Sequence, residues 1–115
     1  IIQASIDKSL QDFNLNIANK SAICVILASG GYPGSYEKDK EIQGLDQTDK
    51  DVLVFHAGTR IKNGRFYTSG GRVLGVTTVQ KDIQTAIDVV YKNVGKITFN
   101  KAYYRKDIAF KALKK

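Results

Sequence analysis

The feature that most limits how this chain can fold is an unbroken apolar run at residues 22–28. The run contains several β-branched residues and no charged side chain. A short run of this kind is typical of a strand that is covered on both faces. It is far shorter than the roughly 20 residues that a membrane-spanning helix needs. We therefore expect a buried strand here and no membrane partner.

Strand and turn patterns recur further along the chain. The pair Asn63-Gly64 is the dipeptide most typical of a tight β-hairpin turn. A second pair, Gly70-Gly71, predicts another turn. Further strands are expected at residues 52–57, 65–68 and 72–79, with a short one near 41–43. Because hairpins join antiparallel strands, we expect a small antiparallel sheet.

Helical spacing of apolar residues appears in three segments. The first covers residues 2–13, with apolar side chains at positions 2, 6, 10 and 13. The second follows Asp82, which can cap a helix whose apolar positions are 83, 86, 87, 90 and 94. The third covers residues 103–113, with Tyr104, Ile108 and Ala112 expected to point inward.

Together these patterns predict an α+β fold, in which two or three helices pack on a small antiparallel β-sheet. A chain of 115 residues has the length of one domain, so we expect a single domain over residues 1–115.

The net charge of +7 suits nucleic acid, phosphorylated metabolites or an acidic partner. The plainer interpretation is a lysine-rich surface, because the lysines are scattered and only Lys111, Lys114 and Lys115 cluster. The chain has no aromatic-rich signature for stacking on RNA. Binding of nucleic acid is therefore not expected.

A single cysteine and a single histidine exclude a four-ligand zinc site, and no metal site is expected. Cys24 lies within the apolar run, where core packing is the expected role, and a lone thiol suits a reducing compartment. His56 either donates a hydrogen bond into a cleft or is a structural histidine. No phosphate loop with its lysine is present, so the chain carries no self-contained nucleotide site.

Two segments combine small residues with an arginine, at residues 54–60 and 68–76. Glycines let a backbone approach a ligand and expose its N–H groups. Arginine can hold a phosphate through two parallel hydrogen bonds. If the hairpin brings both segments to one rim of the sheet, they could bind a phosphomonoester. A plain turn with a solvated arginine is the alternative.

At these segments the chain resembles the phosphoribosylamine–glycine ligases. The family motifs A-[AS]-G-G-Y-P-G-x-Y, V-F-H-A-G-T, N-G-G-R-V-L-x-V-T and Y-R-x-D-I-G match residues 28–36, 54–59, 69–77 and 104–109, in the same order. The resemblance runs from about residue 21 to residue 113. The chain departs from the family at four positions, with Arg60 for Lys, Ser69 for Asn, and Lys101 and Ala109 for Gly.

The resemblance implies that the chain is the C-terminal domain of a longer ATP-grasp ligase, with a fold like the rudiment single hybrid motif. The start Ile1-Ile2-Gln3, without Met, also suggests a piece of a longer protein. Such a ligase uses ATP, with Mg²⁺ or Mn²⁺, to join glycine to phosphoribosylamine during purine biosynthesis in the cytoplasm. Its ATP-grasp and N-terminal domains lie upstream, so the fragment alone is expected to be inactive and to bind no cofactor.

The resemblance also implies roles for individual residues. Related enzymes hold the ribose 5-phosphate with a basic residue and a Gly-Arg segment of this domain. The matching positions are Arg60 and Arg72, with the N–H groups of Gly70 and Gly71, and His56 could line the same rim. The loop at residues 30–36 is expected to face the ATP-grasp core. The alternative function is a stand-alone basic module that binds nucleic acid or an acidic protein.

Overall fold

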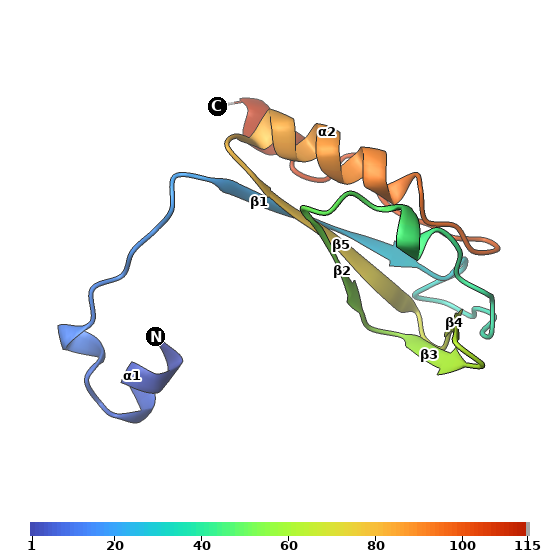
Figure 1. Ribbon diagram of the computed structural model, residues 1–115, viewed down its shortest axis with the longest axis horizontal. Coiled ribbons are helices and arrows are strands. Elements are labelled where there is room, and N and C mark those ends of the chain that lie inside the picture. The colour runs from blue at the N-terminus through green and yellow to red at the C-terminus, as the bar shows by residue number, and fades with distance from the viewer. Residues whose placement is uncertain (115) are drawn as a thin grey trace.

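The computed structural model describes residues 1–114, and its centre is a three-stranded antiparallel sheet with strand order β1-β5-β2. The strands are β1 (Ser21–Ala28), β2 (Val52–His56) and β5 (Arg72–Gln80). The long strand β5 pairs with β1 on one side and with β2 on the other (Figure 1). The α+β class is therefore confirmed, and strands lie at three of the positions that the sequence predicts.

The predicted hairpin is formed by β3 (Thr59–Lys62) and β4 (Arg65–Thr68), which make a separate two-stranded sheet. Its turn residues Asn63 and Gly64 have φ angles of 52° and 75°. A two-residue turn with both φ angles positive matches the twist of its flanking strands, which explains the Asn-Gly pair. The short strand expected near residues 41–43 is reduced to two isolated bridges, Glu41 with Tyr67 and Gln43 with Thr98.

Helix α2 (Ile83–Val94) covers one face of the three-stranded sheet (Figure 1). Asp82 caps it as predicted, because its side chain accepts the backbone N–H of Thr85 at 2.7 Å. The buried apolar side chains of α2 are Ala86, Ile87, Val90 and Val94. They join the inward residues of β1, β2 and β5 in one core.

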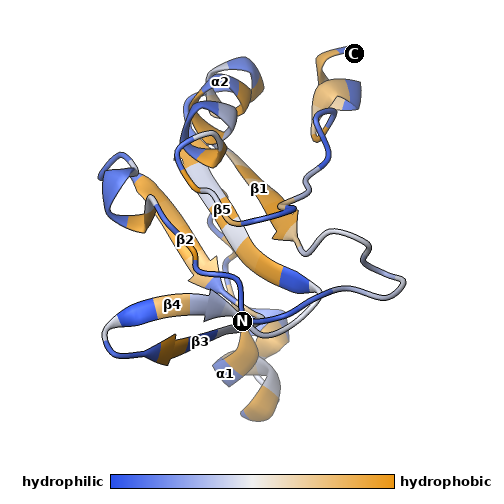
Figure 2. Ribbon diagram, turned by 90° about the vertical axis from the view of Figure 1, so that its right-hand side faces the viewer, coloured by the Kyte–Doolittle hydropathy of each residue, from blue (hydrophilic) through white to orange (hydrophobic). Residues whose placement is uncertain are grey.

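The opposite face of the sheet is uncovered within residues 1–114. Side chains in β1 alternate, so that Val25 and Leu27 are buried while Cys24 and Ile26 are exposed. We call this surface the open face; it consists of Ala22, Cys24, Ile26, Leu53, Phe55 and Val79. The expectation that β1 is covered on both faces is wrong for the described chain, and so is core packing of Cys24. Figure 2 shows hydrophobic colour along most of β1 and β2.

Residues 1–20 form an arm that extends away from the sheet (Figure 1). It contains helix α1 (Ile2–Ile6) and a 3₁₀ turn at Leu10–Asp12, and neither holds a buried residue. The single amphipathic helix expected over residues 2–13 is wrong, since Lys8 interrupts it with a φ of 58°. Short helices depend on tertiary packing for stability, and the apolar side chains of the arm stay exposed, at Ile2, Ile6, Leu10 and Phe13.

The C-terminal segment is irregular rather than α-helical. Tyr103 pairs with Ala28, and a 3₁₀ helix covers Phe110–Lys114, so the α-helix expected over residues 103–113 is wrong. Ala109 has a φ of 68°, which an α-helix cannot include. Tyr104, Ile108 and Ala112 are half-buried, which agrees with their expected inward direction. Lys115, part of the basic tail, lies outside the described residues.

Candidate functional site

The glycine-rich loop at residues 29–36 is fastened to the turn that precedes β5. Ser29 donates its backbone N–H to the carbonyl oxygen of Gly71 at 2.7 Å. Its hydroxyl donates to the carbonyl oxygen of Gly70 at 2.8 Å. Because Ser29 is only 4% exposed, these bonds are shielded from water. Two motifs about 40 residues apart in the sequence therefore lie side by side.

Tyr32 completes this contact with its ring. A Cβ atom added to Gly71 would overlap the Tyr32 ring, so only glycine fits at this position. Tyr36 lies against Tyr32 edge to face, with 6.1 Å between the ring centroids. The peptide bond between Tyr32 and Pro33 is cis. The ring of Tyr32 thus covers the glycine turn from the side of the open face.

The motif at residues 54–59 reaches the same turn through its glycine. Gly58 donates its N–H to the carbonyl oxygen of Arg72 at 2.8 Å, and its own carbonyl oxygen accepts the N–H of Ser69 at 2.7 Å. A Cβ atom on Gly58 would lie 2.7 Å from the Cα of Gly70. The two backbones pass close together, and a larger residue at position 58 would separate them.

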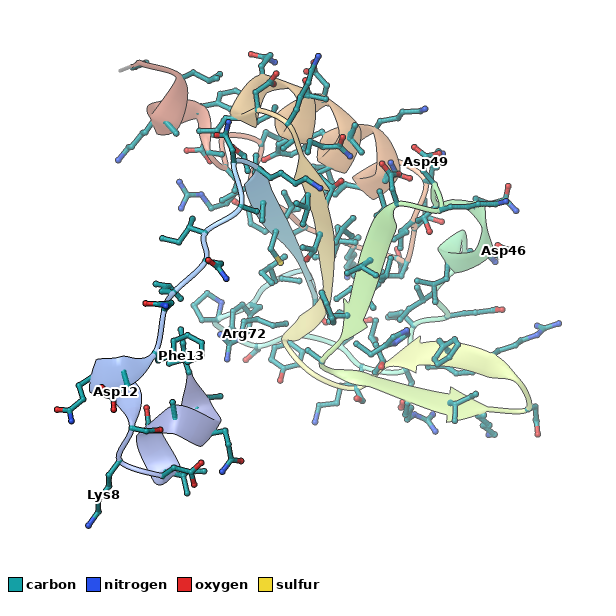
Figure 3. All side chains as sticks on the ribbon, turned by 60° about the vertical axis from the view of Figure 1, so that its left-hand side comes forward. Lys8, Asp12, Phe13, Asp46, Asp49 and Arg72 are labelled. Carbon is teal, nitrogen blue, oxygen red and sulfur yellow. The ribbon has the colours of Figure 1, made fainter. Side chains whose placement is uncertain are left out.

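Arg72 is exposed and lines a hollow of about 430 Å³. We call it the Arg72 hollow; its walls are Ile26, Tyr32, Ala57, Gly71 and Arg72. A second hollow adjoins it, shares three of these residues and is completed by Ala28, Pro33, Tyr103, Tyr104 and Arg105. Figure 3 shows Arg72 and Asp49 at opposite ends of the sheet.

The backbone N–H groups of Gly70 and Gly71 donate to no protein oxygen within residues 1–114. Gly71 is nevertheless buried. A buried N–H group without an acceptor is costly, and an anion is one group that satisfies it. Arg72 follows these two unpaired N–H groups directly in the sequence, and a guanidinium together with free N–H groups suits a phosphate or carboxylate.

Arg60 does not line either hollow. Its Nε donates to Asp39 Oδ1 at 2.8 Å, and its guanidinium lies 5.6 Å from the centroid of the Tyr67 ring. His56 also makes its contacts elsewhere, since Nδ1 lies 2.9 Å from Thr59 Oγ1 and the ring stacks on Phe66 at 4.6 Å. Arg72, Gly70 and Gly71 therefore lie together at the start of β5. Arg60 lies on the hairpin strand β3 and His56 at the end of β2, and neither lines the two hollows.

A cluster of charges anchors the far end of the glycine-rich loop. Glu37 accepts from Lys40 at 2.7 Å and from Lys101 at 3.4 Å. The hydrogen bond from Lys40, followed by that from Lys101, lowers the pKa of the Glu37 carboxyl. Gly30 packs against the Lys101 backbone, where a Cβ atom would lie 2.6 Å from the Lys101 carbonyl oxygen. The loop is thus held at both ends.

The described part of the chain contains no cluster of metal-ligating side chains. Among residues 1–114 no three His, Cys, Asp or Glu side chains come together as a metal site would require. In the same residues no helix is long and apolar enough to cross a bilayer.

A comparison with protein families matches residues 22–111 to the family described as phosphoribosylglycinamide synthetase, C domain. The chain belongs to this family. Within the synthetase C domain, the match spans every element of the site, from β1 to the C-terminal segment, and leaves out most of the arm.

Whole proteins that contain this domain are much longer. A phosphoribosylamine–glycine ligase of Synechocystis is 48% identical over 98% of this chain, which spans 27% of that relative. The human trifunctional purine biosynthetic protein adenosine-3 is 41% identical over 98% of this chain, which spans 11% of it. A crystal structure of phosphoribosylamine–glycine ligase from Thermotoga maritima matches with a TM-score of 0.66 at 36% identity, over 75% of this chain and 21% of that one.

Sequence reasoning missed three residues that surround Arg72 in this synthetase C domain: Tyr32, Tyr103 and Arg105. The loop at residues 30–36 packs directly on Gly70 and Gly71, and that it also faces the ATP-grasp core stays a prediction. The sequence did contain a signal, since Tyr32 and Arg105 stand inside two of the matched motifs. The sequence pattern does not predict the contact between these motifs, because they lie far apart along the chain.

Proposed function

We propose that this chain is the C-terminal domain of a phosphoribosylamine–glycine ligase and that Arg72 holds the 5-phosphate of phosphoribosylamine. In that reaction the glycine carboxylate is activated as an acyl phosphate at the expense of ATP. The amine of phosphoribosylamine attacks the acyl carbon, and glycinamide ribonucleotide, ADP and phosphate are released. The reaction belongs to purine biosynthesis, and we propose that it takes place in the cytoplasm.

The observation that carries this proposal is that Arg72 and Gly71 line one hollow, while the N–H groups of Gly70 and Gly71 donate to no protein oxygen within residues 1–114. A phosphate dianion placed there would receive charge-assisted hydrogen bonds from the guanidinium and satisfy a buried N–H group. Holding the phosphate fixes the amine at the other end of the substrate. Orientation of this kind can supply a large part of the rate enhancement in a two-substrate reaction.

ATP and its Mg²⁺ or Mn²⁺ ion do not fit the residues described here, because no cluster of carboxylates is available to hold a metal ion within residues 1–114. We propose that those sites lie in the upstream domains. We therefore assign to this chain the binding of the phosphorylated substrate and contact with the ATP-grasp core, and no step of the phosphoryl transfer.

The upstream domains of the same protein are the proposed partner of the open face. Exposed apolar patches on a domain mark surfaces that another protein surface covers. Ile26, Leu53 and Phe55 are 43%, 55% and 56% exposed and lie on β1 and β2, the two strands that flank β5. Ile26 also lines the Arg72 hollow, so a domain docked on this face would close the substrate site from one side.

Arg60 and His56 stay as candidates for the same substrate. Arg60 could contribute only if its guanidinium left Asp39, an exposed ion pair of the kind that contributes little to stability. The alternative, a stand-alone basic module that binds nucleic acid or an acidic protein, is unsupported, since the relatives named above are ligases and a purine biosynthetic protein.

The deciding experiment is the steady-state kinetics of Arg72→Ala in the full-length ligase. Loss of one charge-assisted phosphate contact should cost about 1.5–3 kcal/mol. That corresponds to a rise of roughly tenfold to hundredfold in KM for phosphoribosylamine. The KM for ATP should stay unchanged. Arg65→Ala is the matched control, because Arg65 is exposed on the hairpin and pairs only with Glu41. An unchanged KM for phosphoribosylamine in Arg72→Ala would refute the assignment.

A further inference from the structure

Tyr32 occupies a position from which it can recognise more than a phosphate. Its ring packs on Gly71, and it lines both the Arg72 hollow and the hollow that adjoins it. The side chain is nevertheless 38% exposed, so part of the ring is free to contact a ligand. Arg72 lines both hollows with it.

The other walls of the Arg72 hollow are apolar. Ile26 and Ala57 flank Arg72, and Pro33 extends the wall into the adjoining hollow. Inorganic phosphate would use the guanidinium and the N–H groups and would leave these carbon surfaces uncovered. A phosphate ester would carry its sugar across them, and burial of carbon against carbon is favourable.

We propose that Tyr32 is a positioning residue whose ring packs on the C–H surface of the ribose while Arg72 binds the 5-phosphate. The inference rests on the proposed function, because it takes the ligand of Arg72 to be a pentose phosphate. The contact adds selectivity for the sugar. It also fixes the direction in which the rest of the substrate extends from its phosphate group.

The surroundings of Tyr32 favour a fixed ring. Ser29 anchors the start of the loop with two hydrogen bonds to the glycine turn, and Tyr36 supports the ring from its edge. A ring fixed before the substrate arrives loses little conformational entropy on binding.

The test compares two probes, ribose 5-phosphate and inorganic phosphate, by titrating the ¹⁵N-labelled chain of 115 residues and following the Gly71 amide. We expect ribose 5-phosphate to bind roughly threefold to tenfold more tightly than inorganic phosphate, as suits one aromatic contact. Tyr32→Phe should keep this preference, because it keeps the ring. Tyr32→Leu should lose the preference and retain its affinity for inorganic phosphate.

Tyr67→Leu is the matched control, since Tyr67 lies on β4 and lines neither hollow. Two results would overturn the inference. If Tyr32→Leu weakens both probes equally, the ring only holds the loop, and if it changes neither, the ring contacts no sugar. Failure of the proposed function looks different, because Arg72→Ala would then leave the binding of both probes unchanged.

Discussion

Asn93 and Asp49 exchange a pair of hydrogen bonds that fastens helix α2 to the loop before β2. The side-chain amide of Asn93 donates to Asp49 Oδ2 at 3.0 Å, and the backbone N–H of Asp49 donates to Asn93 Oδ1 at 2.8 Å. Asn93 is completely buried and also donates to the carbonyl oxygen of Val89 at 2.9 Å. Its amide group is thus fully used within the chain.

The first prediction concerns Asn93→Leu. The substitution removes all three hydrogen bonds and leaves the Asp49 N–H without a partner. We expect the free energy of unfolding to fall by about 2–4 kcal/mol, measured by urea denaturation. Asn100→Leu is the control, because Asn100 is exposed and should change stability by less than about 0.5 kcal/mol. Equal effects of the two variants would mean that the Asn93 bonds do not stabilise the fold.

The same pair gives a prediction for pH. Hydrogen bonds from Asn93 and then from Lys96 lower the pKa of Asp49 from 3.8 to about 2. A carboxyl whose pKa is lower in the folded state stabilises the fold above its unfolded pKa, and this stabilisation is lost as pH falls toward the folded pKa. Stability should therefore decrease between about pH 5 and about pH 2. Asp49→Asn should be less stable near neutral pH and should lose less stability over that range, as measured by urea denaturation at several pH values.

Lys101 and Ala109 both have positive φ angles, 62° and 68°, in the left-handed region that favours glycine. An L-residue in this conformation costs about 1–2 kcal/mol, while glycine does not. We expect the free energy of unfolding of Lys101→Gly to exceed that of Lys101→Ala by about 0.5–1 kcal/mol, after the larger entropy of glycine in the unfolded chain is subtracted. In thermal denaturation, the glycine variant should therefore unfold at the higher temperature. Both variants remove the exposed pair with Glu37, so the comparison isolates the backbone. If the alanine variant is the more stable of the two, backbone strain at this position is negligible.

Gly71→Ala should destabilise the chain by about 1–3 kcal/mol, because the new methyl group would overlap the Tyr32 ring. In a chain that already carries Tyr32→Ala, the same substitution should cost much less. The interaction energy from this double-mutant cycle, obtained by denaturation of the four proteins, measures the contact directly. Strictly additive effects would show that the ring does not restrict position 71.

Local patterns in the sequence predicted the elements that depend on neighbouring residues. The Asn63-Gly64 turn and the Asp82 cap form as expected, because their geometry is set by a few consecutive residues. The predicted third helix, over residues 103–113, is wrong because the spacing of its apolar residues does not indicate the left-handed backbone at Ala109. The predicted first helix, over residues 2–13, is wrong because a stripe of apolar residues does not specify which surface it packs against.

The open face and the site illustrate the same limit. The apolar run at residues 22–28 reads identically whether one or both of its faces are covered, so Cys24 was expected in the core. For the site, Arg72 and its glycines could be chosen from their chemistry. The contact of Tyr32 with Gly71 joins segments that only the folded chain brings together.

The open face also has a consequence for any mutational scan of this domain. Phe55 and Leu53 are more than half exposed, so a selection for folding of the isolated chain would accept lysine or glutamate at either position. A selection for growth that depends on a complete ligase would reject those changes if the upstream domains dock there. The difference between the two tolerance maps, residue by residue, would outline the docking surface without a structure of the whole protein.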